Sequence, residues 1–120
     1  MKTFRDLLVW QKSMSFVTEI YNESRVFPKE ETFGLTSQIR RSAISIPSNI
    51  SEGFGREGVN DYLRFLNIAM ASLFELQTQL EIAFNLKCIN KENLDKLYEL
   101  SREIERMLSS FIRSIKSKQK

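Results

Sequence analysis

The sequence contains no histidine and one cysteine, Cys88, among its 120 residues. The absence of histidine removes the commonest general base, the Ser-His and Cys-His nucleophile pairs, and the usual ligands of zinc and haem. A single cysteine excludes an internal disulfide and a multi-cysteine metal site. Four glycines and two prolines are too few for a turn-rich all-β protein. We therefore expect no catalytic residue, metal, cofactor or small-molecule substrate, and no enzyme.

Charge is nearly balanced, with 18 basic and 15 acidic residues and a net charge of +3. Five basic residues follow Glu105 and no acidic residue does, so the C-terminal segment is basic and the rest of the chain is close to neutral. Such a segment can hold nucleic acid or anionic lipid, although a solvated, frayed helix end is the favoured interpretation. The basic residues of this segment are Arg106, Arg113, Lys116, Lys118 and Lys120.

No targeting or membrane-spanning segment is recognisable. Asp6 precedes any apolar region at the start of the chain, which argues against a secretory leader. The longest uncharged runs, residues 42–51 and 65–74, have ten residues each. A membrane-spanning helix needs about 20 apolar residues. We expect a cytoplasmic protein without a membrane partner.

Apolar residues recur at intervals of three and four along almost the whole sequence, which is the spacing of amphipathic helices. This pattern predicts four helices, at about 7–26, 35–53, 59–87 and 91–116. Connections of fewer than ten residues favour antiparallel neighbours. With 42% hydrophobic and 28% charged residues, the composition is that of a globular domain. The sequence predicts an all-α fold, a single-domain antiparallel up-down four-helix bundle over residues 1–120.

Local signals place the helix ends. Pro28 ends the first helix, because the residue before a proline is forced out of the α region. Residues 28–34 are predicted to form a short preliminary turn. Gly53 and Gly55 can adopt positive φ at the end of the second helix, and Asn90 is a plausible N-cap of the fourth.

Five apolar residues lie about a quarter-turn away from the main stripes of the second and third helices. One interpretation is that they only broaden the core. The preferred one is a second apolar surface between subunits, because a contiguous exposed apolar patch usually marks an interface. These residues are Ile44, Pro47, Leu63, Met70 and Phe74.

Pro47 is unusual because it falls in the interior of a predicted helix, where it removes a backbone donor and is expected to kink the helix. Serines at positions 42, 45 and 48 flank it. Small side chains permit close helix approach, and their hydroxyls can bond backbone groups freed by a kink.

The segment that carries Pro47, GLTSQIRRSAISIPSNISEGFGR at residues 34–56, resembles the signature of a known family. It is similar to the four-helix bundle proteins, some of which are encoded by intervening sequences within bacterial large-subunit ribosomal RNA genes. The resemblance extends over nearly the whole chain, including FRDLLVWQK at 4–12, YLRFLNIA at 62–69 and SLFELQTQL at 72–80. Departures are Ala71, Ser51 and Gly58, and the last of these weakens a helix cap.

The resemblance implies a homo-oligomer, namely a pentamer. Related accessory variability determinant proteins of diversity-generating retroelements work with a reverse transcriptase and nucleic acid through basic surfaces. By that analogy Arg40, Arg41, Arg56 and Arg64, expected around the corner between the second and third helices, are candidates for phosphate contact. Guanidinium groups match phosphate geometry. Neighbouring acids leave open that some of these arginines serve only structural ion pairs.

These observations favour a non-enzymatic accessory protein that binds nucleic acid, RNA in particular, by electrostatic contact without base readout. The alternative is an oligomeric protein–protein interaction scaffold that binds no nucleic acid. Fold-level kinship does not decide between them.

Overall fold

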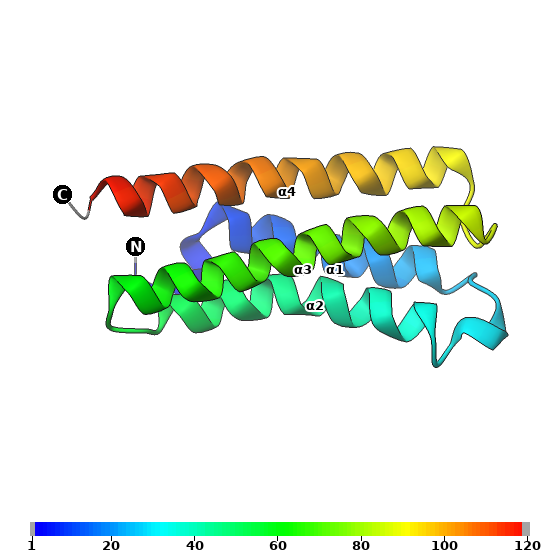
Figure 1. Cartoon of the computed structure of the whole chain (residues 1–120), viewed down its shortest axis with the longest axis horizontal. Coiled ribbons are helices and arrows are strands. Elements are labelled where there is room, and N and C mark those ends of the chain that lie inside the picture. Colours follow the sequence, from blue (N-terminus) through cyan, green and yellow to red (C-terminus); the bar gives the residue numbers. More distant parts are fainter. Residues whose placement is uncertain (1, 119–120) are drawn as a thin grey trace.

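Four long helices run side by side in the computed structural model, which describes residues 2–118. Figure 1 shows that neighbouring helices are antiparallel, with the α2–α3 turn at one end of the bundle and the other two connections at the opposite end. The described body measures 49 × 23 × 20 Å. The predicted all-α four-helix bundle is thus confirmed. The elements are η1 (Phe4–Asp6), α1 (Leu8–Ser24), η2 (Lys29–Glu31), α2 (Leu35–Phe54), α3 (Val59–Asn85) and α4 (Lys91–Ser117).

The helix ends lie within two residues of the ends that the sequence suggests. The short helix η2 occupies the predicted preliminary turn after Pro28. The side-chain oxygen of Asn90 accepts a hydrogen bond of 2.8 Å from the backbone N–H of Asn93, so Asn90 is the N-cap of α4. Gly58 precedes α3 without a side-chain cap, as its missing side chain requires.

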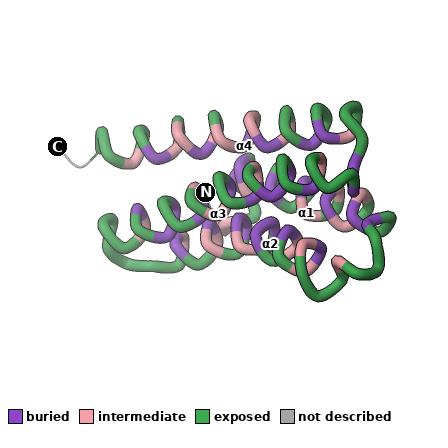
Figure 2. The backbone as a smooth tube through the Cα atoms, turned by 45° about the vertical axis from the view of Figure 1, so that its right-hand side comes forward, coloured by how far each residue is buried: buried purple, intermediate pink, exposed green. Residues whose placement is uncertain are grey.

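The core lies along the axis of the bundle and is built from the predicted apolar stripes. Figure 2 shows that buried residues follow the inward faces of the four helices, whereas the connections are largely exposed. Burial of such side chains is the main favourable contribution to folding. The largest fully buried side chains are Phe16, Ile20, Ile39, Ile46, Ile50, Leu66, Leu73, Leu76, Leu80, Leu97, Ile104 and Leu108.

Gly53 lets α2 and α3 approach each other closely. A Cβ atom added to Gly53 would lie 2.8 Å from Cβ of Phe65 and 3.0 Å from Cδ1 of Tyr62. The predicted role of Gly53 and Gly55 as positive-φ caps is wrong, because no glycine of residues 2–118 has positive φ. Gly55 ends the helix in a right-handed conformation. Gly53 is required for space, not for backbone freedom.

Polar side chains continue this close contact along what we call the α2–α3 seam. The hydroxyls of Ser45 and Ser72 share a hydrogen bond of 2.8 Å. The Ser42 hydroxyl donates to Glu75 of α3 at 3.0 Å, and within α2 the Asn49 Nδ2 donates to the Ser45 carbonyl at 2.8 Å. Small side chains therefore both narrow the gap between the helices and supply the hydrogen bonds across it.

The turn from α3 to α4 contains the one non-glycine residue of positive φ in residues 2–118, Lys87 at 65°. The Lys87 N–H donates to the Phe84 carbonyl at 2.9 Å, and the Cys88 N–H donates to the Ala83 carbonyl at 2.8 Å. This pair of bonds is the Schellman motif, which glycine usually completes. Cys88 is buried, and burial raises the pKa of its thiol.

Candidate nucleic-acid interface

The Arg40 side chain is already engaged in contacts with α1. Its Nε donates to the Ser24 hydroxyl at 2.8 Å, and its Nη2 donates to the Tyr21 carbonyl at 3.3 Å. The guanidinium carbon also lies 4.5 Å from the centroid of the Tyr21 ring. These contacts fasten α2 to the last turns of α1, so Arg40 has a structural role that was left open by the sequence.

Arg41 is exposed and, within residues 2–118, has no hydrogen-bond or ion-pair partner. It lines a shallow hollow of about 450 Å³ between the end of α1 and the start of α2, beside Arg40 and Phe33. Its guanidinium is therefore available to an anionic ligand without the loss of an existing contact.

Arg56 and Arg64 lie together at the turn between α2 and α3. Their guanidinium carbons are 4.7 and 4.6 Å from the centroid of the buried Phe65 ring. Each also faces an acid on the surface: Arg56 is 3.8 Å from Glu52, and Arg64 is 3.3 Å from Asp61. Such exposed pairs are weak and screened by salt, so they compete poorly with a polyanion.

The C-terminal part of α4 lies at this same end of the bundle. The ring of Tyr62 is 6.2 Å from Phe54 of α2 and 6.0 Å from Phe111 of α4, measured between centroids. The exposed basic residues of α4 are therefore at the same end of the bundle as Arg56 and Arg64, and three acids, Glu52, Glu57 and Asp61, lie near the same turn. We call this set the basic end: Arg56, Arg64, Arg113, Lys116 and Lys118.

The sequence alone does not show this arrangement, because the basic segment of α4 and the arginines near the α2–α3 turn are far apart along the chain. The helix lengths do indicate where α4 ends, because α3 and α4 have 27 residues each and a short turn joins them. An α4 of equal length must return to the level at which α3 begins.

The four candidate arginines do not form one cluster, which corrects the expectation from the sequence. Arg41 lies 13 residues before the end of α2 at Phe54. At 1.5 Å per residue, that is about 20 Å along the helix. Arg40 and Arg41 thus belong to the α1 side of the bundle, far from the corner that holds Arg56 and Arg64.

The predicted apolar surface is also divided between two sides of the bundle. Ile44 and Pro47 line a groove together with Trp10 and Met14 of α1. Pro47 is buried, inside a helix that continues to Phe54. It therefore broadens the core, which corrects its assignment to an exposed interface, while Ile44 remains 43% exposed.

Two of the three predicted interface residues of α3, Leu63 and Met70, lie on the helix face that meets α4. Leu63 and Met70 precede Gln77 by multiples of seven residues and share its helix face. The Gln77 side chain donates to Ser101 of α4 at 3.1 Å. Leu63 is buried and Met70 is partly buried against the core, so Leu63 too is a core residue and not an exposed interface residue. Phe74 is 48% exposed.

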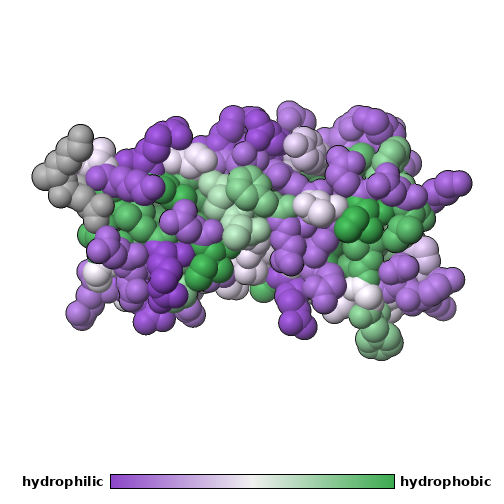
Figure 3. Space-filling model, viewed as in Figure 1, coloured by the Kyte–Doolittle hydropathy of each residue, from purple (hydrophilic) through white to green (hydrophobic). Residues whose placement is uncertain are grey.

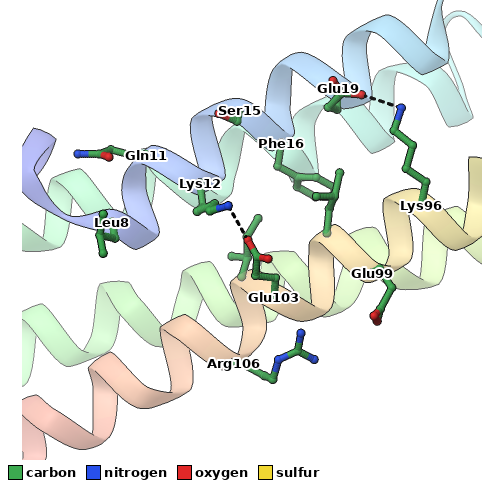
Figure 4. Close-up of a pocket in the computed structure, with 12 residues that line it drawn as sticks. Leu8, Gln11, Lys12, Ser15, Phe16, Glu19, Lys96, Glu99, Glu103 and Arg106 are labelled. Atoms are coloured by element: carbon green, nitrogen blue, oxygen red, sulfur yellow. Dashed lines mark ion pairs between the residues drawn. The ribbon is translucent and has the colours of Figure 1, made fainter.

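A groove of about 800 Å³ separates α1 from α4. Figure 4 shows Phe16 pointing into it from α1, with ion pairs bridging the two helices. Lys12 Nζ is 2.9 Å from Glu103, and Lys96 Nζ is 3.2 Å from Glu19. The hydrogen bond with Glu19 raises the pKa of Lys96. The cations that line this groove are therefore largely neutralised by neighbouring carboxylates.

Tyr62 is the ionisable side chain most strongly perturbed at the basic end. Its hydroxyl is buried and, in the part of the chain that the structure describes, has no hydrogen-bond partner. Burial raises the pKa of Tyr62 to about 12. Because the neutral phenol is favoured, Tyr62 contributes packing at this end and no charge.

Neither a group of metal-binding side chains nor a membrane-spanning helix is present in the part of the chain that the structure describes. Within residues 2–118, no three His, Cys, Asp or Glu side chains are grouped so that they could hold a metal ion. No helix in this part of the chain is long and apolar enough to cross a bilayer. Figure 3 shows that apolar atoms on the viewed face lie in separate patches between hydrophilic side chains.

Comparison with known proteins agrees with the resemblance seen in the sequence. Residues 5–110 match the model of the 23S rRNA-intervening sequence protein family. The crystal structure of a protein of unknown function from the S23 ribosomal protein family of Bacteroides thetaiotaomicron VPI-5482 has a TM-score of 0.82 and 31% sequence identity. The match covers 88% of this chain and 96% of that one. No curated protein matches the chain. The chain belongs to the 23S rRNA-intervening sequence protein family.

Proposed function

We propose that this protein is a non-enzymatic, homo-oligomeric accessory factor that binds RNA. The side chains of its basic end would contact the phosphate groups of the RNA. The observation that supports the proposal is that basic side chains from two separate parts of the chain, the α2–α3 turn and the last turns of α4, lie at the same end of the bundle, where the rings of Phe54, Tyr62 and Phe111 pack together. Such a surface binds by charge and counterion release and does not read bases.

Arg56 and Arg64 are suited to phosphate because the ring of Phe65 supports both guanidiniums. A guanidinium placed over a ring loses less conformational freedom when it meets a ligand than a free side chain does. Their surface partners Glu52 and Asp61 lower the local positive charge. Affinity for a single protomer should therefore be modest.

Self-association would raise that affinity, because several weak sites on one particle bind a polyanion together. Of the five apolar residues predicted for an interface, Ile44 and Phe74 are exposed. Ile44 lines a groove with residues of α1, whereas Phe74 lies one helical turn before Gln77, whose side chain contacts α4. A closed ring requires such an arrangement, since each copy must offer one face to the copy before it and another to the copy after it. A pentamer, which the family resemblance implies, is a ring of this kind.

The RNA proposal is tested by the salt dependence of binding to a labelled RNA duplex. We expect the double variant Arg56→Gln/Arg64→Gln to weaken binding and to lower the slope of log K against log salt by about 0.9 for each lost contact. The matched control is Lys87→Gln/Lys91→Gln, which removes two exposed charges at the opposite end of the bundle and should leave binding unchanged.

Equal losses in the two double variants would refute a site at the basic end. Salt-insensitive retention of a polypeptide, with no RNA bound, would instead support the protein–protein scaffold.

The ring proposal is tested by sedimentation of Ile44→Glu and Phe74→Glu, each alone and mixed. Each variant loses one of the two faces, so each alone should sediment as a monomer. The mixture should form 1:1 dimers, because the intact face of one variant still meets the intact face of the other. A monomeric wild-type protein at micromolar concentration would contradict the ring, as would a mixture that fails to pair.

A further inference from the structure

Phe33 lies almost entirely in solvent, 97% exposed, although it is a large apolar side chain. It belongs to the short link between η2 and α2. Backbone hydrogen bonds hold this link on both sides: the Thr32 N–H donates to Lys29 at 3.1 Å, and the Gly34 N–H donates to Glu31 at 3.1 Å. The ring is therefore presented by an ordered turn, and it contributes nothing to the core of the protomer.

Phe33 also lines the shallow hollow that Arg41, whose side chain has no partner within residues 2–118, lines from α2. Tyr21, Ser37, Arg40 and Ile44 complete most of the lining, so the hollow combines apolar side chains, hydroxyl-bearing side chains and two positively charged residues. Arg40 is fixed by Tyr21 and Ser24, whereas Arg41 is free to contact a ligand. A ligand that satisfies this surface has a flat apolar face and a negative charge.

We infer that this hollow binds a nucleotide of single-stranded RNA, with its base stacked on Phe33 and its phosphate on Arg41. Proteins that bind single strands combine stacking rings with basic side chains in this way. A duplex keeps its bases inside the helix, so it cannot offer them to Phe33. The inference rests on the proposed function and adds to it a preference for unpaired RNA.

The start of α2 is not the anion site in this arrangement. The carboxylate of Glu31 already accepts a hydrogen bond of 3.3 Å from the backbone N–H of Leu35. A phosphate placed there would meet a negative charge. Arg41, less than two turns farther along α2, avoids this repulsion and lies on the surface of the hollow.

The inference is tested by fluorescence anisotropy with a labelled, unstructured RNA strand of about 12 nucleotides and with the same strand annealed to its complement. Phe33→Ala should weaken binding of the single strand by about fivefold to a hundredfold and leave duplex binding unchanged. Phe33→Tyr keeps a ring and should retain wild-type affinity. Arg41→Gln should weaken single-strand binding and lower its salt slope by about 0.7.

The outcomes separate this inference from the proposed function. If wild-type protein binds neither RNA, both fail. If Phe33→Ala binds the single strand as wild type does, while Arg56→Gln/Arg64→Gln weakens duplex binding, only the stacking site fails. If Phe33→Ala changes the sedimenting mass, Phe33 contacts another copy of the chain and the inference is overturned. Because Phe33 is so exposed, its variants should fold normally, which circular dichroism checks.

Discussion

Two pairs of neighbouring helices in this bundle are joined by opposite means. Along the α2–α3 seam, Gly53 and several serines bring the helices into close contact, and hydrogen bonds such as that between Ser45 and Ser72 cross the interface. Between α1 and α4, larger side chains leave a groove of about 800 Å³, which is bridged by the ion pairs of Lys12 and Lys96.

The difference shows how side-chain size determines what an interface tolerates. At Gly53 the α2–α3 seam leaves no room for a Cβ atom, so an added methyl group must move α3 away from α2. The α1–α4 groove is open to water, and its ion pairs are exposed and easily replaced by hydration. We therefore expect stability to depend strongly on small changes in the first interface and weakly on large changes in the second.

The largest effect is expected from Gly53→Ala. The new Cβ would lie 2.8 Å from Cβ of Phe65, which cannot move without its helix. Overpacking of this kind costs about 1–3 kcal/mol, measurable by urea denaturation. The control is Gly55→Ala, whose new Cβ would have its nearest neighbour at an ordinary 3.6 Å. If both variants unfold at the same urea concentration, the close contact at Gly53 does not restrict the size of the residue that this position tolerates.

A smaller loss is expected from Ser72→Ala, which leaves the Ser45 hydroxyl without its partner across the seam. Loss of one such hydrogen bond costs about 1 kcal/mol. A double-mutant cycle with Ser45→Ala isolates the coupling between the two hydroxyls. Strictly additive effects would mean that the hydrogen bond contributes nothing to stability.

Tyr62→Phe tests the packing near Gly53, at the end of the α2–α3 seam, through the pH dependence of stability. The folded protein holds the phenol proton up to a pKa of about 12, well above the ordinary value of 10. The stability that this neutral phenol provides is present below pH 10 and is lost as the pH rises toward 12. Wild-type protein should therefore lose more stability than Tyr62→Phe between pH 9 and 11.5, as thermal unfolding at each pH can show. Parallel losses in the two proteins would contradict a buried, unpaired hydroxyl.

The smallest effect is expected at the α1–α4 groove. Replacing both partners of the exposed Lys12–Glu103 pair with alanine removes a contact of 2.9 Å. Exposed pairs contribute about 0.2–1 kcal/mol, and salt reduces that further. We expect a coupling energy near the lower limit, vanishing in 1 M salt. A coupling as large as that of Ser45 and Ser72 would remove the contrast between the two interfaces.

The fold was predictable because every helix carries a long apolar stripe with the helical period. Asn90 and Pro28 indicated where α4 and η2 begin, because a helix cap and a proline act on the backbone of adjacent residues. Gly53 was assigned the wrong role, since the sequence shows a missing side chain but not the Phe65 atoms that approach it. Lys87 adopts a glycine-like conformation that no local rule anticipates.

The candidate site was less predictable, because it depends on which helices meet. Ile44 and Phe74 look alike on helical wheels, yet α1 borders one and α4 borders the other. Arg40 looks as free as Arg41 until the Tyr21 ring and carbonyl are in place beside it. Phe33 was overlooked because a lone aromatic in a connection has no periodic pattern to mark it.

The arrangement of the chain ends affects how these sites can be studied. In Figure 1, α1 begins and α4 finishes at the end of the bundle that also holds the α2–α3 turn. A purification tag, fusion partner or immobilising linker joined to the start of α1 or the end of α4 would extend from the end of the bundle that carries the α2–α3 turn, where it would compete for space with a bulky polyanion. A fluorophore for RNA titrations is better placed on an engineered cysteine along the middle of α4, at a distance from both surfaces.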